Sequence, residues 1–377
     1  MDHRGSRTKS LASQGKANDN EDLAFQLIDE NGNFNDMRLK AFAREVSLHQ
    51  CGRSYAVVAI MGPQSSGKST LLNHLFHTKF KMMNDSDGRY QTTQGIWLGR
   101  CPDIKPLTLV LDMEGTDGSE RGEDDAAFEK RSALLALAIA DVVLINLWCQ
   151  DIGREHAANK PLLRAVFQQV LVQFCDKQCK ITLMFVVRDK TKSPEDVLEA
   201  YLKEDIEKIW ASILKPSGTT NLQLHNFFKV EVVFLPNYEE RGEEFKLKIK
   251  DLRKRFENST APGGLADSGD DKVPASWFPV IAQNSWQDIM ENKDLDLPAH
   301  KVMVATVCCE EIINEQQDSF EMNVDWCKLR KDAQFGFVPD FGKRVNSILN
   351  TYLSEYDAKT LYLDEEVTNA KRKELLN

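Results

Sequence analysis

The segment from Tyr55 to Leu72, YAVVAIMGPQSSGKSTLL, constrains the fold of this chain more than any other. It places Gly62-x-x-x-x-Gly67-Lys68-Ser69 directly after a β-branched apolar run and directly before a helix-like run. Glycines allow backbone angles at which consecutive N–H groups point inward at phosphate oxygens, and the following helix adds the positive end of its dipole. In this context the pattern predicts a loop that binds the phosphates of a nucleoside triphosphate.

The side chains of this loop have expected roles as well. Lys68 is expected to reach the β- and γ-phosphates, and the Ser69 hydroxyl is expected to bind Mg²⁺. The alternative is a chance strand-to-helix turn rich in Gly and Ser, against which the flanking strand and helix patterns argue. The residues expected to contact the nucleotide in this loop are Gly62, Pro63, Gln64, Ser65, Ser66, Gly67, Lys68, Ser69 and Thr70.

Strand-like and helix-like runs alternate through the middle of the chain, which predicts an α/β fold with a mostly parallel sheet and helices on both faces. Several strand candidates are continuous apolar runs, as expected of strands covered on both faces. The strand candidates are Tyr55–Met61, Leu107–Leu111, Val142–Leu147, Ile181–Val187 and Val230–Leu235. The helix candidates are Lys68–Phe76, Phe128–Ala140, Pro161–Phe174, Pro194–Ile213 and Glu239–Phe256.

Charge, the longest apolar run and the spacing of cysteines each argue against certain classes of protein. The 377 residues carry 58 acidic and 48 basic side chains, a formal net charge of −10, which disfavours sequence-independent nucleic-acid binding and electrostatic docking on anionic lipid. The longest apolar run, Ala133–Trp148, is short for a membrane span and contains Asp141 and Asn146. The eight cysteines lack zinc-site spacing, so reduced thiols in a cytosolic protein are expected.

Three regions are expected along the chain. Residues 1–20 are polar without a signal peptide and are expected to be disordered, and residues 21–297 are expected to form the nucleotide-binding domain, with a long surface loop at Asn258–Ser276. From 298 to 377 no strand pattern remains, and apolar residues recur at helical spacing, which predicts two or three amphipathic helices. These apolar residues are Phe341, Val345, Ile348, Leu349, Tyr352, Leu353 and Tyr356.

Two further patterns are typical of a nucleotide-hydrolysing switch protein. The strand candidate ending at Leu111 leads into Asp112-Met113-Glu114-Gly115, a D-x-x-G pattern in which Asp112 would hold Mg²⁺ through a water and the Gly115 N–H would contact the γ-phosphate. The polar segment 85–95 contains Thr92 and Thr93, and either hydroxyl is a candidate to complete the Mg²⁺ ligands. The alternative for the D-x-x-G pattern is an ordinary acidic turn, and the alternative for the segment 85–95 is a polar loop without a metal-binding role.

The base-binding group is expected after the strand candidate Ile181–Val187, which ends in Arg188-Asp189-Lys190. Guanine presents N1–H and N2–H₂ donors that a carboxylate such as Asp189 accepts as a pair, whereas adenine has no such pair. The N-K-x-D pattern is absent, and a structural ion pair between Arg188 and Asp189 is the alternative.

Six segments together resemble one known family. GPQSSGKSTLLNHLF, QTTQGIW, DMEGTDGSERGEDD, NLWCQDIGREHAANKPLL, FVVRDKTK and DLDLPAHKVMVAT are similar, in this order, to the plant Root Hair Defective family of dynamin-like GTPases, which are related to atlastins. The resemblance runs from about Phe25 to the end of the chain. It implies GTP hydrolysis, a GTP-dependent homodimer, and homotypic fusion of endoplasmic reticulum membranes from their cytosolic face through a C-terminal membrane hairpin that these 377 residues lack.

The resemblance also implies roles for single residues. Thr93, rather than Thr92, would bind Mg²⁺, because Thr93-Gln94-Gly95-Ile96-Trp97 reproduces the T-x-G-I-W pattern of the guanylate-binding relatives. Arg188 and Asp189 fit their Arg-Asp base motif, and a last guanine-contacting loop is implied near Pro236–Tyr238.

The phosphate loop departs from the atlastin pattern in one respect. Atlastins and guanylate-binding proteins carry an arginine in this loop, whereas this chain has Gln64-Ser65, which is similar to dynamin. Gln64 would then orient the attacking water, and Ser65 would help to hold K⁺ or Na⁺ in place of the arginine charge. The other hypothesis is that Arg89, from the polar segment, supplies this charge on dimerisation.

Two other functions are compatible with the same residues. One is a nucleotide-gated tether or scaffold with negligible hydrolysis, against which the presence of Gln64, Lys68 and Thr93 argues. The other is a defence GTPase of the guanylate-binding type.

Overall fold

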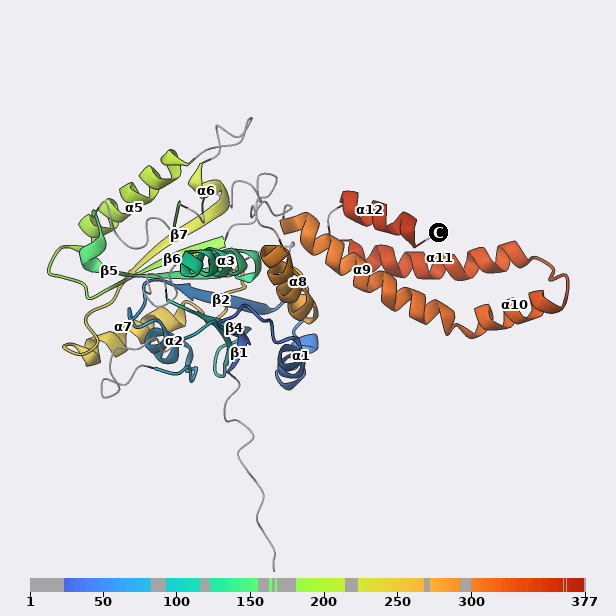
Figure 1. The fold of residues 1–377 in the computed structure, drawn as a ribbon, viewed down its shortest axis with the longest axis horizontal. Helices are drawn as coiled ribbons and strands as arrows, with labels where there is room; N and C mark the ends of the chain where they lie inside the picture. Colours follow the sequence, from blue (N-terminus) through green and yellow to red (C-terminus); the bar gives the residue numbers. More distant parts are fainter. Residues whose placement is uncertain are drawn as a thin grey trace, which may run out of the picture.

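A computed structural model describes residues 24–82, 93–115, 123–154, 163–164, 167, 181–213, 223–267, 272–291, 300–361, 363 and 365–375. Within these residues the chain forms an α/β domain with a helical extension on one side (Figure 1). Some of the sequence predictions fall outside these ranges. They concern the segment 1–20, the expected helix 161–174 except residues 163, 164 and 167, and the residues Arg89 and Thr92.

The domain is built on one sheet of seven strands in the order β1-β3-β4-β2-β5-β6-β7. β2, β4, β5, β6 and β7 are parallel, while β3 pairs antiparallel with both β1 and β4. The mostly parallel sheet predicted from the sequence is therefore confirmed. The strands are β1 (Phe25–Ile28), β2 (Tyr55–Met61), β3 (Ile96–Cys101), β4 (Leu107–Met113), β5 (Val142–Trp148), β6 (Ile181–Arg188) and β7 (Phe228–Phe234).

Helices cover both faces of this sheet, which explains why all seven residues of β2 are buried. Alternate residues of each strand point to opposite faces, so that Val57 belongs to one core cluster and Val58 to the other. The first cluster receives α1 (Asp36–Glu45), α3 (Glu123–Ile139), α5 (Glu195–Ser212) and α8 (Phe278–Glu291). The second receives α2 (Lys68–Phe76) and α7 (Gly242–Lys254).

Short elements complete the domain: the four-residue helix α6 (Leu224–Phe227) and the 3₁₀ turns η1 (Leu48–Gln50), η3 (Cys149–Asp151) and η5 (Ala275–Trp277). The segment predicted as a surface loop, Asn258–Ser276, has no helix or strand within its described residues 258–267 and 272–274, and part of it is buried. Leu265 and Ala266 are buried in the second cluster, and Thr182 of β6 donates a hydrogen bond to the carbonyl of Leu265 over 2.7 Å.

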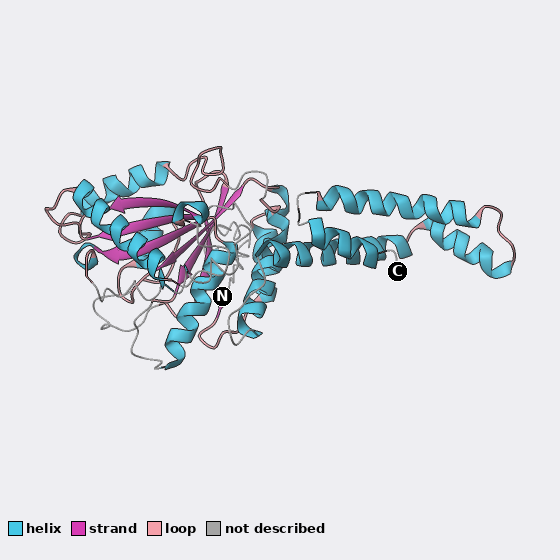
Figure 2. Ribbon diagram, turned by 90° about the horizontal axis from the view of Figure 1, so that it is seen from above, coloured by secondary structure: helices cyan, strands magenta, loops and turns pink. Residues whose placement is uncertain are grey.

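The helical extension contains four helices among the described residues, more than the two or three predicted. They are α9 (His300–Glu321), α10 (Val324–Phe335), α11 (Phe341–Thr360) and α12 (Glu365–Glu374). α9 and α11 lie side by side and project away from the sheet, as Figures 1 and 2 show. At the far end Phe335 and Phe337 are 82% and 92% exposed. In the described helices no stretch is apolar and long enough to cross a membrane.

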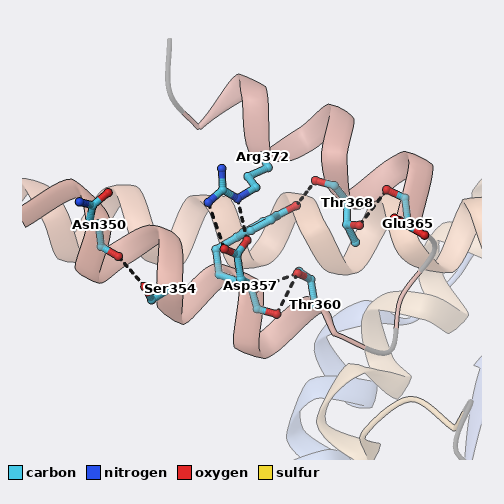
Figure 3. Close-up of polar contacts among 8 residues, drawn as sticks. Asn350, Ser354, Asp357, Thr360, Glu365, Thr368 and Arg372 are labelled. Carbon is cyan, nitrogen blue, oxygen red and sulfur yellow. Dashed lines mark hydrogen bonds and ion pairs between the residues drawn. The ribbon is translucent and has the colours of Figure 1, made fainter. Parts of the chain in front are cut away.

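α12 adds a third helix to the half of the extension nearer the sheet. Arg372 binds Asp357 of α11 through two hydrogen bonds of 2.7 and 3.0 Å, and the Tyr356 hydroxyl donates to the Thr368 carbonyl over 3.1 Å (Figure 3). Tyr356 itself is fully buried with Ile312. Of the seven apolar residues predicted on α11, only Leu353 and Tyr356 are buried.

Candidate nucleotide site

A pocket of about 380 Å³ lies at the carboxyl ends of the parallel strands, where ligands bind in open α/β sheets. One part of its wall, from Gln64 to Thr70, is the loop after β2 together with the first turn of α2. Another part is formed by Thr93, before β3, and Gly115, after β4. Trp148, Arg188, Asp189, Asn237, Tyr238, Glu239 and Met82 complete the lining.

The phosphate-binding loop has the backbone geometry that its glycines predict. Gly67, which precedes α2, has φ +75°, and Gly62 has φ +148°. A Cβ on Gly62 would lie 2.3 Å from the carbonyl oxygen of Asn146, so no larger residue fits there. Ser65 has φ +56° and is exposed, which leaves its hydroxyl on the open side of the loop.

Ser66 is held from inside the domain. Its hydroxyl donates to the Pro63 carbonyl over 2.6 Å, which closes the loop on itself. Asn146 of β5, fully buried, donates its side-chain N–H₂ to the Ser66 carbonyl at 2.9 Å and to the Ser66 hydroxyl at 2.8 Å. The loop shape is therefore fixed by a neighbouring strand as well as by its own residues.

Arg188, at the end of β6, points to the same loop. Its guanidinium donates to the carbonyls of Ser66 at 3.4 Å and Gly67 at 3.2 Å, and it lies 5.4 Å from the centre of the Phe245 ring. Burial lowers the pKa of Arg188, and the nearby Asp189 carboxylate opposes that shift. The structure thus places Arg188 against the phosphate loop, and both Arg188 and Asp189 line the pocket.

Lys68 is buried and lies over the start of the loop. Its ammonium donates to the carbonyls of Gly62 at 3.1 Å and Pro63 at 3.0 Å. Burial lowers the pKa of Lys68 to about 8, although the carboxylates of Asp112 and Glu114 act in the opposite direction. A bound phosphate would raise this pKa again, since an opposite charge favours the ionised group.

Three oxygen-bearing side chains meet beside Lys68, although they come from different parts of the chain. The Ser69 hydroxyl donates to Asp112 Oδ2 over 2.6 Å and lies 3.1 Å from the hydroxyl of Thr93. Burial raises the pKa of the Asp112 carboxyl to about 6, against the hydrogen bond from Ser69 and the charge of Lys68. The other oxygen, Asp112 Oδ1, is buried and has no hydrogen-bond partner in the described part of the chain.

This set of groups fits Mg²⁺. Mg²⁺ prefers oxygen ligands and usually keeps several waters while it is held by one or two protein groups and by substrate phosphates. The two hydroxyls and the spare carboxylate oxygen of Asp112 supply such ligands next to the phosphate loop. The sequence predicted these three residues as a metal site, and the fold brings them together.

Gly115 lies against the phosphate loop. A Cβ at this position would meet Gln64 Cα at 2.5 Å and Lys68 Nζ at 2.8 Å, so only glycine allows this approach. The D-x-x-G segment therefore reaches the loop at Gln64, the residue expected to orient water. No hydrogen bond from the Gln64 or Ser65 side chain is found among the described residues, so their catalytic roles stay predictions.

The far end of the pocket offers the groups expected for a base. Asp189 has φ +54°, a conformation that aspartate tolerates, and it lies at the pocket wall with Trp148. Asn237 and Tyr238, where the sequence predicted the last base-contacting loop, line the same end. The Tyr238 hydroxyl lies 3.3 Å from His74 Nε2, and its ring packs on Phe245 at 5.2 Å.

Sequence reasoning missed Asn146, Trp148 and Glu114 as parts of this site. Asn146 appeared only as a polar interruption of an apolar run. An asparagine inside a buried strand needs hydrogen-bond partners, and the adjacent phosphate loop was a candidate to supply them. Glu114, 6% exposed, occupies an unspecified position of the D-x-x-G pattern, and its carboxylate accepts a hydrogen bond from the Gly95 N–H.

Comparison with known proteins identifies the family. Residues 61–298 match the domain described as the Root hair defective 3 GTP-binding protein (RHD3) GTPase domain. The chain belongs to this family. It therefore carries a GTPase domain, and the resemblance inferred from the six segments is confirmed.

Relatives extend the match beyond the GTPase domain. Protein ROOT HAIR DEFECTIVE 3 homolog 2 of Arabidopsis thaliana is 56% identical over 350 residues, which are 93% of this chain and 42% of that protein. Homolog 1 from the same plant is 58% identical over 93% of this chain and 44% of its own length. Protein SEY1 homolog of Dictyostelium discoideum is 38% identical over 86% of this chain and 37% of its own length. The chain thus spans less than half the length of these relatives.

Among solved structures, the bacterial selenocysteine-specific elongation factor EF-Sec is 17% identical, with 53% of this chain and 29% of that chain covered and a TM-score of 0.32. At this score the likeness carries no argument.

Proposed function

We propose that this chain hydrolyses GTP to GDP and phosphate with Mg²⁺ bound at Ser69, Thr93 and Asp112. The observation that carries the proposal is the meeting of these three side chains beside Lys68, at one end of a pocket whose other end is lined by Asp189. An activity assay with GTP and ATP tests it. We expect turnover of GTP only.

The proposed reaction is an in-line attack of water on the γ-phosphate. Phosphoryl transfer leaves little covalent work for the protein, so catalysis consists of positioning and charge stabilisation. The backbone N–H groups from Gln64 to Ser69 and the Lys68 ammonium bind the phosphates, while the Gly115 N–H contacts the γ-phosphate. Gln64 orients the water. Mg²⁺, when bound, would neutralise charge on the phosphate oxygens.

The selection of guanine is assigned to Asp189. A carboxylate accepts from both N1–H and N2–H₂ of guanine, and adenine cannot donate this pair. Isothermal calorimetry separates the possibilities directly. Equal heats for GTP and ATP, or none for either, would contradict the proposal.

A positive charge is still needed at the γ-phosphate, because the loop has Ser65 where atlastins have arginine. A monovalent cation, K⁺ or Na⁺, held with the help of Ser65 is one source, and Arg89 is the other. Two assays distinguish them. Replacement of K⁺ and Na⁺ by choline abolishes turnover only in the first case, and Arg89→Ala does so only in the second.

We further propose that GTP drives homodimerisation in trans, and that the dimer serves tethering and homotypic fusion of endoplasmic reticulum membranes. The support is family membership and the helical extension, which provides a lever next to the GTPase domain; the membrane hairpin implied by the resemblance is not within these residues. Analytical ultracentrifugation with GDP and with a non-hydrolysable GTP analogue tests dimerisation. A dimer without any turnover would instead favour the nucleotide-gated scaffold.

A further inference from the structure

Glu114 and Gly95 form a reciprocal pair between the two loops that face the γ-phosphate end of the pocket. The Glu114 carboxylate accepts a hydrogen bond from the Gly95 N–H, and the Glu114 N–H donates to the Gly95 carbonyl over 3.0 Å. The Glu114 side chain is buried at 6% exposure. A carboxylate in such a site forms a stronger hydrogen bond than a neutral acceptor at the surface.

The position of this pair makes it relevant to the reaction. The register of β3 and β4 ends with Ile96 opposite Met113, so Gly95 and Glu114 are the next residues on each side. Next to them in sequence stand Gln94 and Thr93 on one side and Gly115 on the other. The pair therefore continues the β3–β4 pairing by one residue, between the backbone that leads to Thr93 and the backbone that carries Asp112 and Gly115.

The segment around Gly95 is also held on its outer side, which makes the pair a fixed point. Gly95 has φ +70°, and a Cβ there would lie 2.1 Å from the Ile28 carbonyl at the end of β1. The carbonyl of the preceding residue, Gln94, accepts from Gln26 Nε2 at 3.0 Å and from Trp97 Nε1 at 3.1 Å. On its inner side, the hydrogen bond of the Gly95 N–H to the Glu114 carboxylate joins this segment to the D-x-x-G loop.

We propose that Glu114 is a positioning residue, whose hydrogen bond to the Gly95 N–H sets the Thr93 hydroxyl at the distance from Asp112 and Gly115 that the reaction requires. The effect on turnover rests on the proposed GTP hydrolysis, whereas the effect on the Gly95 segment does not. In this role Glu114 acts through its reach and its acceptor oxygen. It does not take a proton from the attacking water.

Three substitutions separate these roles. Glu114→Gln keeps the length and an acceptor oxygen but loses the charge, while Glu114→Asp keeps the charge but is shorter by one methylene, and Glu114→Ala loses both. A positioning role predicts that the Gln variant keeps kcat within about threefold of the original chain, and that the Asp and Ala variants lose about tenfold or more, the cost of leaving a buried N–H without its acceptor. A proton-accepting role predicts the opposite order for Gln and Asp.

Hydrogen exchange supplies a readout that does not depend on hydrolysis. The peptide covering residues 93–98 is expected to exchange faster without nucleotide in Glu114→Asp and Glu114→Ala, and at the original rate in Glu114→Gln. Peptides from α5 and α11 serve as internal controls for global unfolding. Unchanged exchange at 93–98 in both Asp and Ala variants would overturn the inference even if GTP turnover is confirmed. Absent turnover in the original chain, with the exchange pattern as expected, would instead overturn only the proposed function.

Discussion

Asn146 and Arg188 hold the same residue of the phosphate-binding loop from two neighbouring strands. Asn146 donates to the Ser66 carbonyl at 2.9 Å and Arg188 donates to the same oxygen at 3.4 Å. The Ser66 carbonyl is buried, so its hydrogen bonds replace those it would make with water. The loop that binds phosphate thus depends on side chains from β5 and β6 as well as on its own glycines.

The shared acceptor predicts that Asn146 and Arg188 are energetically coupled. We expect Asn146→Ala to lower the free energy of unfolding by about 1–3 kcal/mol and to raise KM for GTP, since a buried carbonyl loses its better partner. The double variant with Arg188→Met is expected to depart from additivity by about 0.5 kcal/mol or more. Urea unfolding of the four proteins measures this, with Asn350→Ala on the exposed side of α11 as the matched control. Strict additivity would show that the two side chains act independently.

Asp112→Asn is predicted to weaken Mg²⁺ binding. The substitution keeps the shape and the contact with Ser69 but removes the charge, and loss of a group that supports a metal ion typically costs about 10–100-fold in affinity. The measurement is GTP turnover as a function of Mg²⁺ concentration. We expect the half-saturating concentration to rise by about that factor, while Asp251→Asn on α7 leaves it unchanged. If both variants titrate alike, Asp112 has no part in the metal site.

Asp189→Asn is predicted to change which base is selected. The amide offers an N–H₂ donor where the carboxylate offered an acceptor, so the guanine N1–H and N2–H₂ pair is lost and the carbonyl at position 2 of xanthine becomes a suitable partner. GTP affinity is expected to fall at least about tenfold and XTP affinity to rise. Calorimetry with both nucleotides checks this, with Asp196→Asn as the control. Retained preference for GTP would assign base selection to another group, for which Asn237 in the pocket lining is a candidate.

The parallel strands and α2 were predictable because each carries its own local signal. β2 has the predicted bounds, and α2 runs from Lys68 to Phe76 as predicted, since Gly67 and His77 at its ends adopt left-handed conformations. β1 and β3 were missed for physical reasons as well. β1 has only four residues, and β3 is an edge-side antiparallel strand in which Gly99 and Arg100 interrupt the apolar pattern.

The site residues that could be predicted are, in the same way, those that carry a local sequence signal. Lys68, Ser69 and Asp112 lie in short motifs whose spacing reflects one loop or one strand end. Asn146 contacts Ser66 across 80 positions of sequence, and no spacing rule connects them. Glu114 meets Gly95 only because β3 returns antiparallel to β4, and this strand was not in the predicted sheet.

A buried ion pair lies at the amino end of β5, away from the nucleotide pocket. We predict that breaking it lowers the stability of the domain and leaves GTP turnover unchanged. Lys272 binds Asp141 Oδ2 over 2.6 Å and lies 4.3 Å from the Tyr55 ring centre, and the same carboxylate oxygen accepts from the Val57 N–H. Lys272→Met leaves a buried carboxylate without its cation, which costs about 3–5 kcal/mol.

Turnover per folded molecule is expected to stay unchanged in this variant, because Asp141 lies before β5 and the nucleotide pocket lies beyond its far end. The double variant Asp141→Asn/Lys272→Met removes both charges and keeps an acceptor for Val57, so it should regain part of the stability. A double variant that is less stable than Lys272→Met would contradict this account. Chemical unfolding and turnover on the same samples provide both measurements.

We predict that the free energy of unfolding depends on pH through His74, which contacts Tyr238 in the wall of the pocket. Burial lowers the pKa of His74, and the charges of Lys246 and Arg188 act in the same direction, so the folded protein favours the neutral ring more than the unfolded chain does. The resulting stabilisation is complete above the unfolded pKa of about 6.5 and is lost as the pH falls through the lower folded pKa. His74→Gln removes the titrating group. The difference in unfolding free energy between the original chain and this variant should shrink from pH 7.5 to pH 5.5 and stay constant from pH 7.5 to pH 8.5, where the ring is neutral in both states. A constant difference across the whole range would mean that the ring titrates alike in the folded and unfolded chain.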